Sequence, residues 1–247
     1  MISLTFRLRM PNLMFKLLYF IVFCLIALQS WAVHLNVVTE HRIPLNYLNE
    51  KGEIVGDATQ IVRKILESSD VSYSMEVYSW ARAYYKAQNE PNTMIFSIRR
   101  TKEREHKFHW ICPLIESERE FIYRLSSRDD IQIVYFNDAK SYSLGVVRDD
   151  FTHEKLVTNG FIEGKHLDVN NDGLANLKKL LKGRVDLIVQ SDRSIERRMT
   201  ALKLPLSTVT PVIPFELDQP TCMGFNKKTD PEILDKITKS HGLIFKN

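Results

Sequence analysis

From residue 33 onward, short apolar segments of strand length alternate with longer segments that carry an apolar stripe. Residues 35–39 suit a buried strand, and Ile61, Val62, Ile65 and Leu66 then recur at the spacing of one helical face. A strand followed by a helix and then by a further strand favours parallel pairing. The pattern therefore predicts an α/β fold built on mostly parallel sheets.

Further elements continue the alternation along the chain. Asp57 is expected to cap the first helix, and Asp230 followed by Pro231 to start the last one. Other helices are expected from Ser79, over 151–157 and over 174–181. Further strands are expected at 71–77, 94–98, 121–125, 131–136, 143–147, 187–189 and 221–226.

The loops at 40–47, 79–82 and 99–104 follow the expected strands 35–39, 71–77 and 94–98, and they should meet at the carboxyl edge of one sheet. Open α/β sheets bind ligands at that edge. The third loop holds Arg99, Arg100 and Arg104, and the Thr101 hydroxyl is placed to cap a short helix there. Guanidinium groups beside a helix start form a binding site for a carboxylate. The alternative is a solvated cluster of charged side chains in which neighbouring glutamates balance the arginines.

Residues 1–32 have the composition of a secretory signal peptide. Arg7, Arg9 and Lys16 precede an apolar run over 17–28, and small residues then flank Trp31 at the cleavage offsets. A retained anchor is the alternative, although the run is shorter than the roughly 20 residues that a spanning helix needs. We expect cleavage before Val33 and export to the periplasm.

Export changes how charge and cysteine content are interpreted. Three basic and no acidic residues lie in 1–32, so 31 Lys+Arg face 30 Asp+Glu in the rest of the chain. This balance gives no argument for nucleic acid as a partner. Cys112 and Cys222 remain after cleavage, and in an oxidising compartment both a disulfide and two separate buried thiols fit.

A series of short motifs resembles family 3 of the periplasmic solute-binding proteins, the amino-acid-type receptors of ABC transporters. The resemblance covers essentially all of the chain after the leader, and its specificity lies in the order of the motifs. They are Pro44 with Tyr47, Gly52 with Gly56, Trp80, the strand 94–98 followed by Thr101-x-x-Arg104-Glu105, Phe108-x-Trp110 with Pro113, and Gly183-Arg184-x-Asp186 before a strand.

The resemblance implies a type II periplasmic binding fold, with two lobes joined by a two-strand hinge. Lobe 1 would comprise 33–117 and 218–247, and lobe 2 would comprise 118–217. The crossings would fall near 115–119 and 214–220, which places Cys112 and Cys222 close to the hinge.

The resemblance also implies roles for residues in the cleft. Arg104 would bind the carboxylate of the ligand, and Arg99 would add a second cationic contact. Trp80 and Tyr47 would pack on the ligand, although Trp80 also suits the core. Arg82 or Glu40 would adjust charge selectivity, and a solvated Arg82 is the alternative. Ser191 is the last residue expected to contact the ligand.

Two positions depart from the family pattern. Asp149 and Asp150 stand where the family has Gly and Thr, which suits a cationic ligand group or a helix cap. Ser191, with Asp192 next to it, stands where many members hold the ligand's amino group with an acid. The ligand is therefore expected to be small and anionic or zwitterionic, and not necessarily an ordinary α-amino acid.

Motifs for metal binding or catalysis are incomplete. Asp168 to Gly173 begins like a calcium loop, but Lys179 occupies the position of the bidentate Glu, so a turn that caps helix 174–181 is favoured. His106 and His109 have no evident third ligand, and no nucleophile elbow or phosphate loop occurs. We expect no cofactor, no metal and no catalysis, although exported dehydratases share the two-lobe fold.

The predicted function is therefore an exported solute-binding protein that serves an ABC transporter. A monomer with a small-molecule ligand is expected, and its protein partner would be an ABC permease or a membrane sensor. The alternatives are a periplasmic sensing or interaction module of the same fold and, further off, an exported enzyme.

Overall fold

A computed structural model describes residues 34–215 and 219–246 of the chain. The predicted signal peptide, residues 1–32, lies outside the described residues. No helix in the described ranges is long and apolar enough to cross a membrane.

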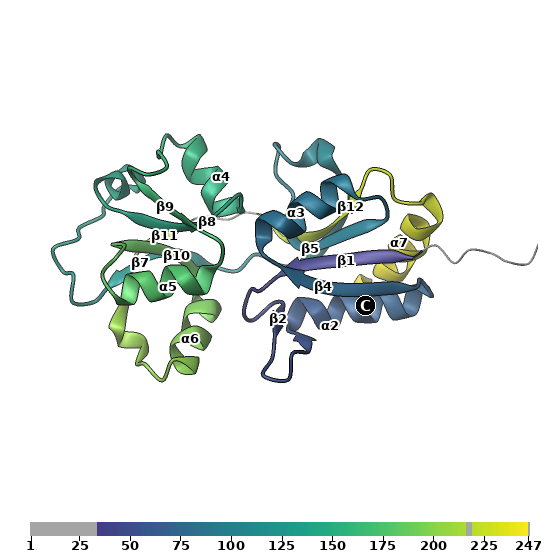
Figure 1. Cartoon of the computed structure of the whole chain (residues 1–247), viewed down its shortest axis with the longest axis horizontal. Coiled ribbons are helices and arrows are strands. Elements are labelled where there is room, and N and C mark those ends of the chain that lie inside the picture. Colours follow the sequence, from purple (N-terminus) through teal and green to yellow (C-terminus); the bar gives the residue numbers. More distant parts are fainter. Residues whose placement is uncertain (1–33, 216–218, 247) are drawn as a thin grey trace, which may run out of the picture. The chain divides into compact units, whose positions relative to one another are not determined.

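The first sheet has five strands, four of which run in one direction (Figure 1). The reversed strand is β12, which pairs antiparallel with both of its neighbours. β5 lies at the centre and is buried along its whole length. In spatial order the strands are β4 (Tyr73–Tyr78), β1 (Leu35–Glu40), β5 (Thr93–Arg99), β12 (Thr221–Asn226) and β6 (Phe108–Ile115).

Helices cover both faces of this sheet because side chains alternate along β1. Leu35 and Val37 pack in a core with α2 (Asp57–Ser69) and α7 (Pro231–Phe245), whereas Val38 packs with α3 (Trp80–Asn89) on the other face. Figure 1 shows α3 on one side of β1 and α2 with α7 on the other.

The second sheet repeats this plan, with β7 as its reversed strand. One face packs against α4 (Phe151–Thr158), and the other packs against α5 (Gly173–Leu181) and α6 (Asp192–Ala201). In spatial order its strands are β11 (Val209–Phe215), β7 (Glu120–Leu125), β10 (Leu187–Ser191), β8 (Leu144–Val147) and β9 (Leu167–Asn170).

The remaining elements are short. β2 (Tyr47–Leu48) and β3 (Ile54–Val55) form a two-stranded sheet between β1 and α2. Three single-turn or short 3₁₀ helices complete the described chain: η1 (Glu105–Lys107), η2 (Phe136–Ser141) and η3 (Leu206–Thr208).

The chain passes from the first sheet to the second between β6 and β7, and returns between β11 and β12. A disulfide joins Cys112 on β6 to Cys222 on the neighbouring β12, with 4.6 Å between their Cα atoms. The whole second sheet therefore lies inside the loop that this disulfide closes. The lobe boundaries 33–117 with 218–247, and 118–217, stay a prediction.

Gly56, rather than Asp57, is the N-cap of α2, which corrects the sequence-based expectation. Gly56 has φ of 124°, and a Cβ at this position would lie 2.4 Å from the backbone oxygen of Leu45. Only glycine therefore allows the loop after β1 to approach the helix start so closely. The Asp57 carboxylate is instead free to form an ion pair with Arg193.

Two further local expectations are wrong. The short helix η1 begins after Arg104 and receives no side-chain cap, so the Thr101 hydroxyl does not cap it. Residues 131–135 form no strand, although Ile131 and Ile133 are buried at alternate positions. The Asp138 carboxylate accepts hydrogen bonds from the backbone N–H of Val134 and Tyr135, and this turns the chain into η2.

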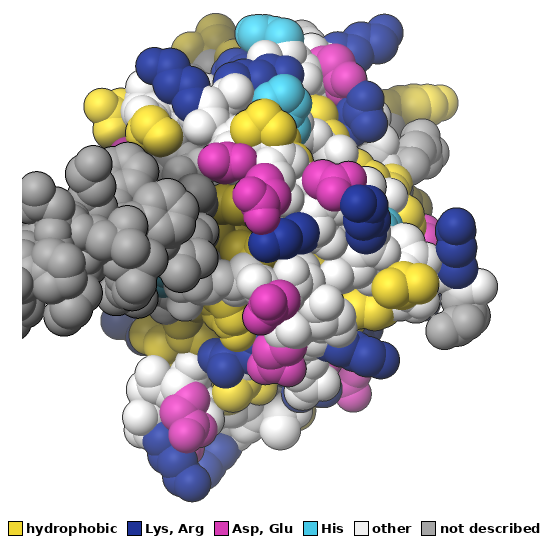
Figure 2. Space-filling view, turned by 90° about the vertical axis from the view of Figure 1, so that its right-hand side faces the viewer, with side chains coloured by type: hydrophobic (Ala, Val, Ile, Leu, Met, Phe, Trp, Pro, Cys, Tyr) yellow, Lys and Arg dark blue, Asp and Glu magenta, His cyan; other side chains and the backbone are white. Residues whose placement is uncertain are grey.

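Charge is mixed on the face that Figure 2 presents. Lys and Arg side chains are interspersed there with Asp and Glu side chains. This distribution agrees with the near balance of charge expected after residue 32.

Candidate functional site

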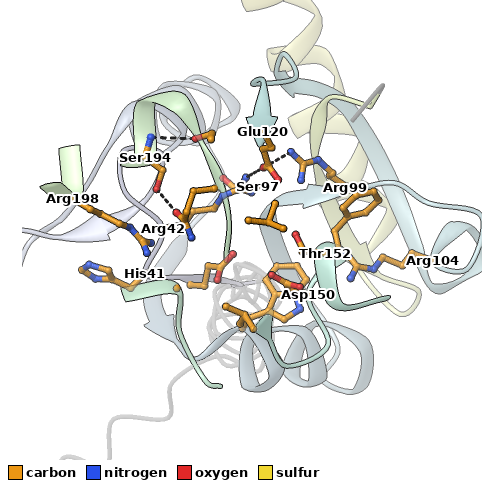
Figure 3. A pocket seen from close by; sticks show the side chains of 18 residues that line it. His41, Arg42, Ser97, Arg99, Arg104, Glu120, Asp150, Thr152, Ser194 and Arg198 are labelled. Atoms are coloured by element: carbon orange, nitrogen blue, oxygen red, sulfur yellow. Dashed lines mark hydrogen bonds and ion pairs between the residues drawn. The ribbon is translucent and has the colours of Figure 1, made fainter. Parts of the chain in front are cut away.

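A cavity of about 80 Å³ lies where the carboxyl-end loops of both sheets meet (Figure 3). The first sheet contributes the carboxyl ends of β1 and β5, residues that follow them and the start of α3. The second contributes the carboxyl ends of β8 and β10, residues that follow β8, β9 and β10, and the start of β7. The charged residues that line the cavity are Glu40, Arg42, Arg99, Arg104, Glu120, Asp150 and Arg198.

Glu120, the first residue of β7, binds two guanidinium groups at once. Its Oε1 lies 3.0 Å from Nη2 of Arg42 and 3.0 Å from Nη2 of Arg99. Figure 3 shows these two contacts on either side of the carboxylate. Two cations share one buried anion, so this part of the cavity carries an excess positive charge.

Arg104 is completely buried and lies against two aromatic rings that stack on each other. Its guanidinium carbon is 5.2 Å from the ring centre of Trp80 and 5.1 Å from that of Tyr84. Nη2 donates to the backbone oxygen of Asp149 at 3.1 Å and forms an ion pair with Glu154 at 2.9 Å. Nε and Nη1 have no hydrogen-bond partner among the described residues, so Arg104 has buried N–H groups that are not satisfied by the protein.

Burial shifts the ionisation of three further groups at the cavity. It raises the pKa of Glu40 even though four arginines lie nearby, and it lowers the pKa of Arg198 to about 10. It also raises the pKa of Asp150 to about 7, against the opposing effect of the hydrogen bond from the backbone N–H of His153. Each of these charges is poorly solvated and would gain from an opposite charge inside the cavity.

Five of the seven residues suggested by the sequence line the cavity: Glu40, Trp80, Arg99, Arg104 and Ser191. Trp80 has both of its suggested environments, since it packs in the core around α3 and also reaches the cavity. Its indole Nε1 donates to the backbone oxygen of Asp149 at 2.6 Å. The Ser191 hydroxyl accepts a hydrogen bond from the backbone N–H of Ser194 and caps α6.

Tyr47 and Arg82 are not among the lining residues. Tyr47 lies in β2, where its ring contacts that of His41 at 6.1 Å between centres. Arg82 follows Trp80 by two residues, which is about 200° around a helix, so the two side chains leave α3 on opposite sides. The Arg82 guanidinium lies 4.6 Å from the ring centre of Tyr78.

Arg42, Glu120 and Arg198 line the cavity although no role in the site was predicted for them. The position of Glu120, an acid at the start of an apolar strand, was a weak indication of a role in the site. Arg198 gave no such indication, because α6 itself was not predicted. Other lining residues without an earlier role are His41, Ser97, Val147, Phe151, Thr152, Gly173, Val189, Gln190 and Ser194.

The calcium-like segment has a structural role. Asp172 caps α5 by accepting hydrogen bonds from the backbone N–H of Leu174 and Ala175, as the sequence predicted. Lys179 lies 2.6 Å from the Asp168 carboxylate and supplies a positive charge inside the loop. Among the described residues, no group of three or more His, Cys, Asp or Glu is placed to hold a metal ion.

Comparison with known families identifies the chain. Residues 35–247 match the model of the bacterial extracellular solute-binding proteins, family 3. The chain belongs to this family. Family 3 solute-binding proteins are typically non-enzymatic and are typically found outside the cytoplasm. A search of curated proteins gives no match.

Solved structures show the same fold for this family 3 chain. An ancestral arginine-binding protein bound to arginine has a TM-score of 0.75 at 19% identity, over 87% of this chain and 93% of that one. A Salmonella typhimurium periplasmic binding protein with high arginine specificity has a TM-score of 0.72 at 12% identity, over 87% and 95%.

A third similar structure is a histidine kinase sensor domain that resembles periplasmic binding proteins. Its TM-score is 0.74 at 18% identity, over 86% of this chain and 90% of that one. With the two arginine-binding structures it confirms the predicted type II periplasmic binding fold, with one α/β sheet in each lobe. At these identities the likeness extends to the fold alone.

Proposed function

We propose that this chain captures a small amino-acid-like solute, zwitterionic or anionic, in the cavity between its two sheets. The observation that carries the proposal is the set of incompletely paired charges that converge on one small space. Arg104 offers N–H groups without a partner, and Glu40 and Asp150 are carboxyl groups whose pKa values are raised by burial. A solute with both an anionic and a cationic group would compensate both signs of charge.

The anionic group of the solute is assigned to Arg104, with Arg99 nearby. Arg104 is held by two rings and by Asp149, so its position is fixed before the solute arrives. A preorganised guanidinium loses little freedom on binding. The cationic group is assigned to the carboxyl groups of Glu40 and Asp150.

Binding favours contact between the two lobes, because solute contacts come from both sheets. Trp80 and Arg104 of the first sheet's loops already bond to Asp149 of the second. A solute that contacts both sides shifts a hinge equilibrium only by its differential affinity for the closed form. In the proposed function, an ABC permease recognises this closed form, in the periplasm, after removal of the signal peptide.

Sensing is the second candidate function, and the likeness to a histidine kinase sensor domain favours it. The same solute-bound form would then be recognised by a membrane sensor. Co-purification of the chain with a permease or with a membrane sensor separates the two functions.

The test is a thermal-shift screen of the protein against amino acids, small carboxylates, polyamines and peptidoglycan fragments, followed by calorimetry. A solute at a hundred times its Kd stabilises the protein by about 2.7 kcal/mol. Arg104→Gln should weaken binding of the solute found by about tenfold to a hundredfold, because a charge-assisted hydrogen bond is lost.

Arg82→Gln is the matched control, since Arg82 lies on α3 but does not line the cavity. It should leave Kd unchanged. Equal losses in both variants, or no loss in Arg104→Gln while the variant stays folded, would contradict the assignment of the anion to Arg104.

A further inference from the structure

A fourth arginine, Arg198 of α6, reaches the cavity from the lobe that does not hold Arg104. Its residue is only 5% exposed, and it lines the cavity together with Gly173 and Ser194. Figure 3 shows Arg198 and Arg104 on opposite sides of the space. The two guanidinium groups are therefore placed to contact different ends of one solute.

The Arg198 guanidinium lacks partners of its own. Nε and Nη1 have no hydrogen bond to any described residue. Glu40 and Asp172 face it and favour its charge, whereas Arg42 opposes it, but no ion pair joins Arg198 to either acid in the described part of the chain. A buried guanidinium without a bonded anion is unfavourable, so this site is incomplete without a negatively charged group.

The backbone of α5 is shaped to admit this side chain. A Cβ at Gly173 would lie 2.8 Å from Nη1 and 3.1 Å from Nη2 of Arg198. The guanidinium thus rests against the first residue of α5, and the positive end of that helix lies beside it. The N–H groups of Leu174 and Ala175 at that helix end already bond to the Asp172 carboxylate, so the attraction for a further anion comes from Arg198.

We propose that Arg198, resting on Gly173, forms a second anion subsite, and that the solute is an amino dicarboxylate. The inference rests on the proposed function, which places the first anionic group at Arg104. The second carboxylate of the solute binds Arg198, and its amino group faces Glu40 and Asp150. A solute with a cationic side chain would meet Arg198 unfavourably, in contrast to the arginine bound by the two similar proteins.

The test compares acids with their amides of nearly equal shape. Binding of L-glutamate, L-aspartate, L-glutamine, L-asparagine and L-arginine is measured by calorimetry. The acids should bind about tenfold to a hundredfold more tightly than their amides, and L-arginine more weakly than L-glutamate. In Arg198→Gln the advantage of acid over amide should fall to less than about threefold, while binding of the amides changes little.

Two variants make the result specific. Arg197→Gln removes an exposed arginine from the same helix and should keep the full preference for acids. Gly173→Ala keeps the charge but forces the Arg198 guanidinium to move, and should reduce the preference for acids. It also serves as the test if Arg198→Gln does not fold.

The outcomes separate this inference from the proposed function. Amides or L-arginine that bind as tightly as the acids, or an acid preference that Arg198→Gln and Gly173→Ala leave intact, would overturn the second subsite alone. A loss of stability in Arg198→Gln without a change in acid preference would mean that Arg198 only compensates Glu40, and would overturn it too. If none of the five solutes binds, the amino dicarboxylate is wrong, and the wider screen decides the proposed function.

Discussion

The disulfide between Cys112 and Cys222 should contribute a large part of the stability of the protein. The two residues are 110 positions apart, so the bond closes a loop that contains the entire second sheet. Closing a loop of this length restricts the unfolded chain by about 5 kcal/mol in the chain-entropy model. Native disulfides typically stabilise by about 2–5 kcal/mol, so the model value is an upper bound.

The variant Cys112→Ala with Cys222→Ala tests this value. Alanine avoids burying a new hydroxyl group at position 222, where the side chain is 1% exposed. A loss of about 2–5 kcal/mol should lower Tm by about 5–15 °C for a domain of this size. Calorimetry of the variant, the oxidised protein and the protein with reductant separates the effect of the cross-link from that of the side chains.

Reduced protein and the double variant should melt close together, and both well below the oxidised protein. Solute affinity should be unchanged, because the bond acts chiefly on the unfolded chain and neither cysteine lines the cavity. A double variant that melts within about 1 °C of the oxidised protein would refute the loop-closure reasoning.

Two acidic residues of the cavity give further predictions. Glu120→Gln leaves Arg42 and Arg99 without their shared anion and should cost about 3 kcal/mol in urea unfolding. Glu105→Gln breaks an exposed pair with Arg100 and should cost far less, so similar costs in the two variants would contradict this. Folding raises the pKa of Asp150 from 3.8 to about 7, so the folded state binds this proton more tightly and stability should fall as pH rises through that window. Asp150→Asn keeps an N-cap for α4 and should remove the loss of stability that comes from deprotonation of Asp150. If the unfolding free energy of this variant depends on pH as it does in the unchanged protein, the raised pKa of Asp150 is not its cause.

Periodicity predicted the fold well where residues obey a simple rule of burial. β1, β5, β8 and β12 are short and almost wholly buried, and their ranges match the expected strands within two residues at either end. The Asp172 cap of α5 and the Pro231 start of α7 were also predicted, because both depend on neighbours in sequence.

Prediction failed where burial contradicts residue type. The α6 segment contains Asp192, Arg193, Glu196, Arg197 and Arg198, and reads as a solvated stretch. Its apolar face consists chiefly of Ile195 and Met199, one helical turn apart. Since Arg198 is a charged residue in a buried position, no pattern of apolar residues could have revealed its contact with the cavity.

The candidate site was predicted in part for a similar reason. Glu40 and Arg99 end strands and Arg104 follows one, and strand ends of a parallel sheet converge by topology. Arg82 follows a strand as well, but the turn of α3 directs it away from the cavity. Only the direction of each side chain in the folded protein distinguishes these cases.

The sequence by itself determined the α/β class, the order of most elements and the family, because these depend on local periodicity and on motifs in a fixed order. It also provided two cysteines after the leader, but left open whether they are joined. The tertiary structure decided which charges meet. Arg42 and Glu120 are 78 residues apart, and Arg198 and Arg104 come from different sheets. Their convergence depends on how two sheet edges pack together, which no local pattern encodes.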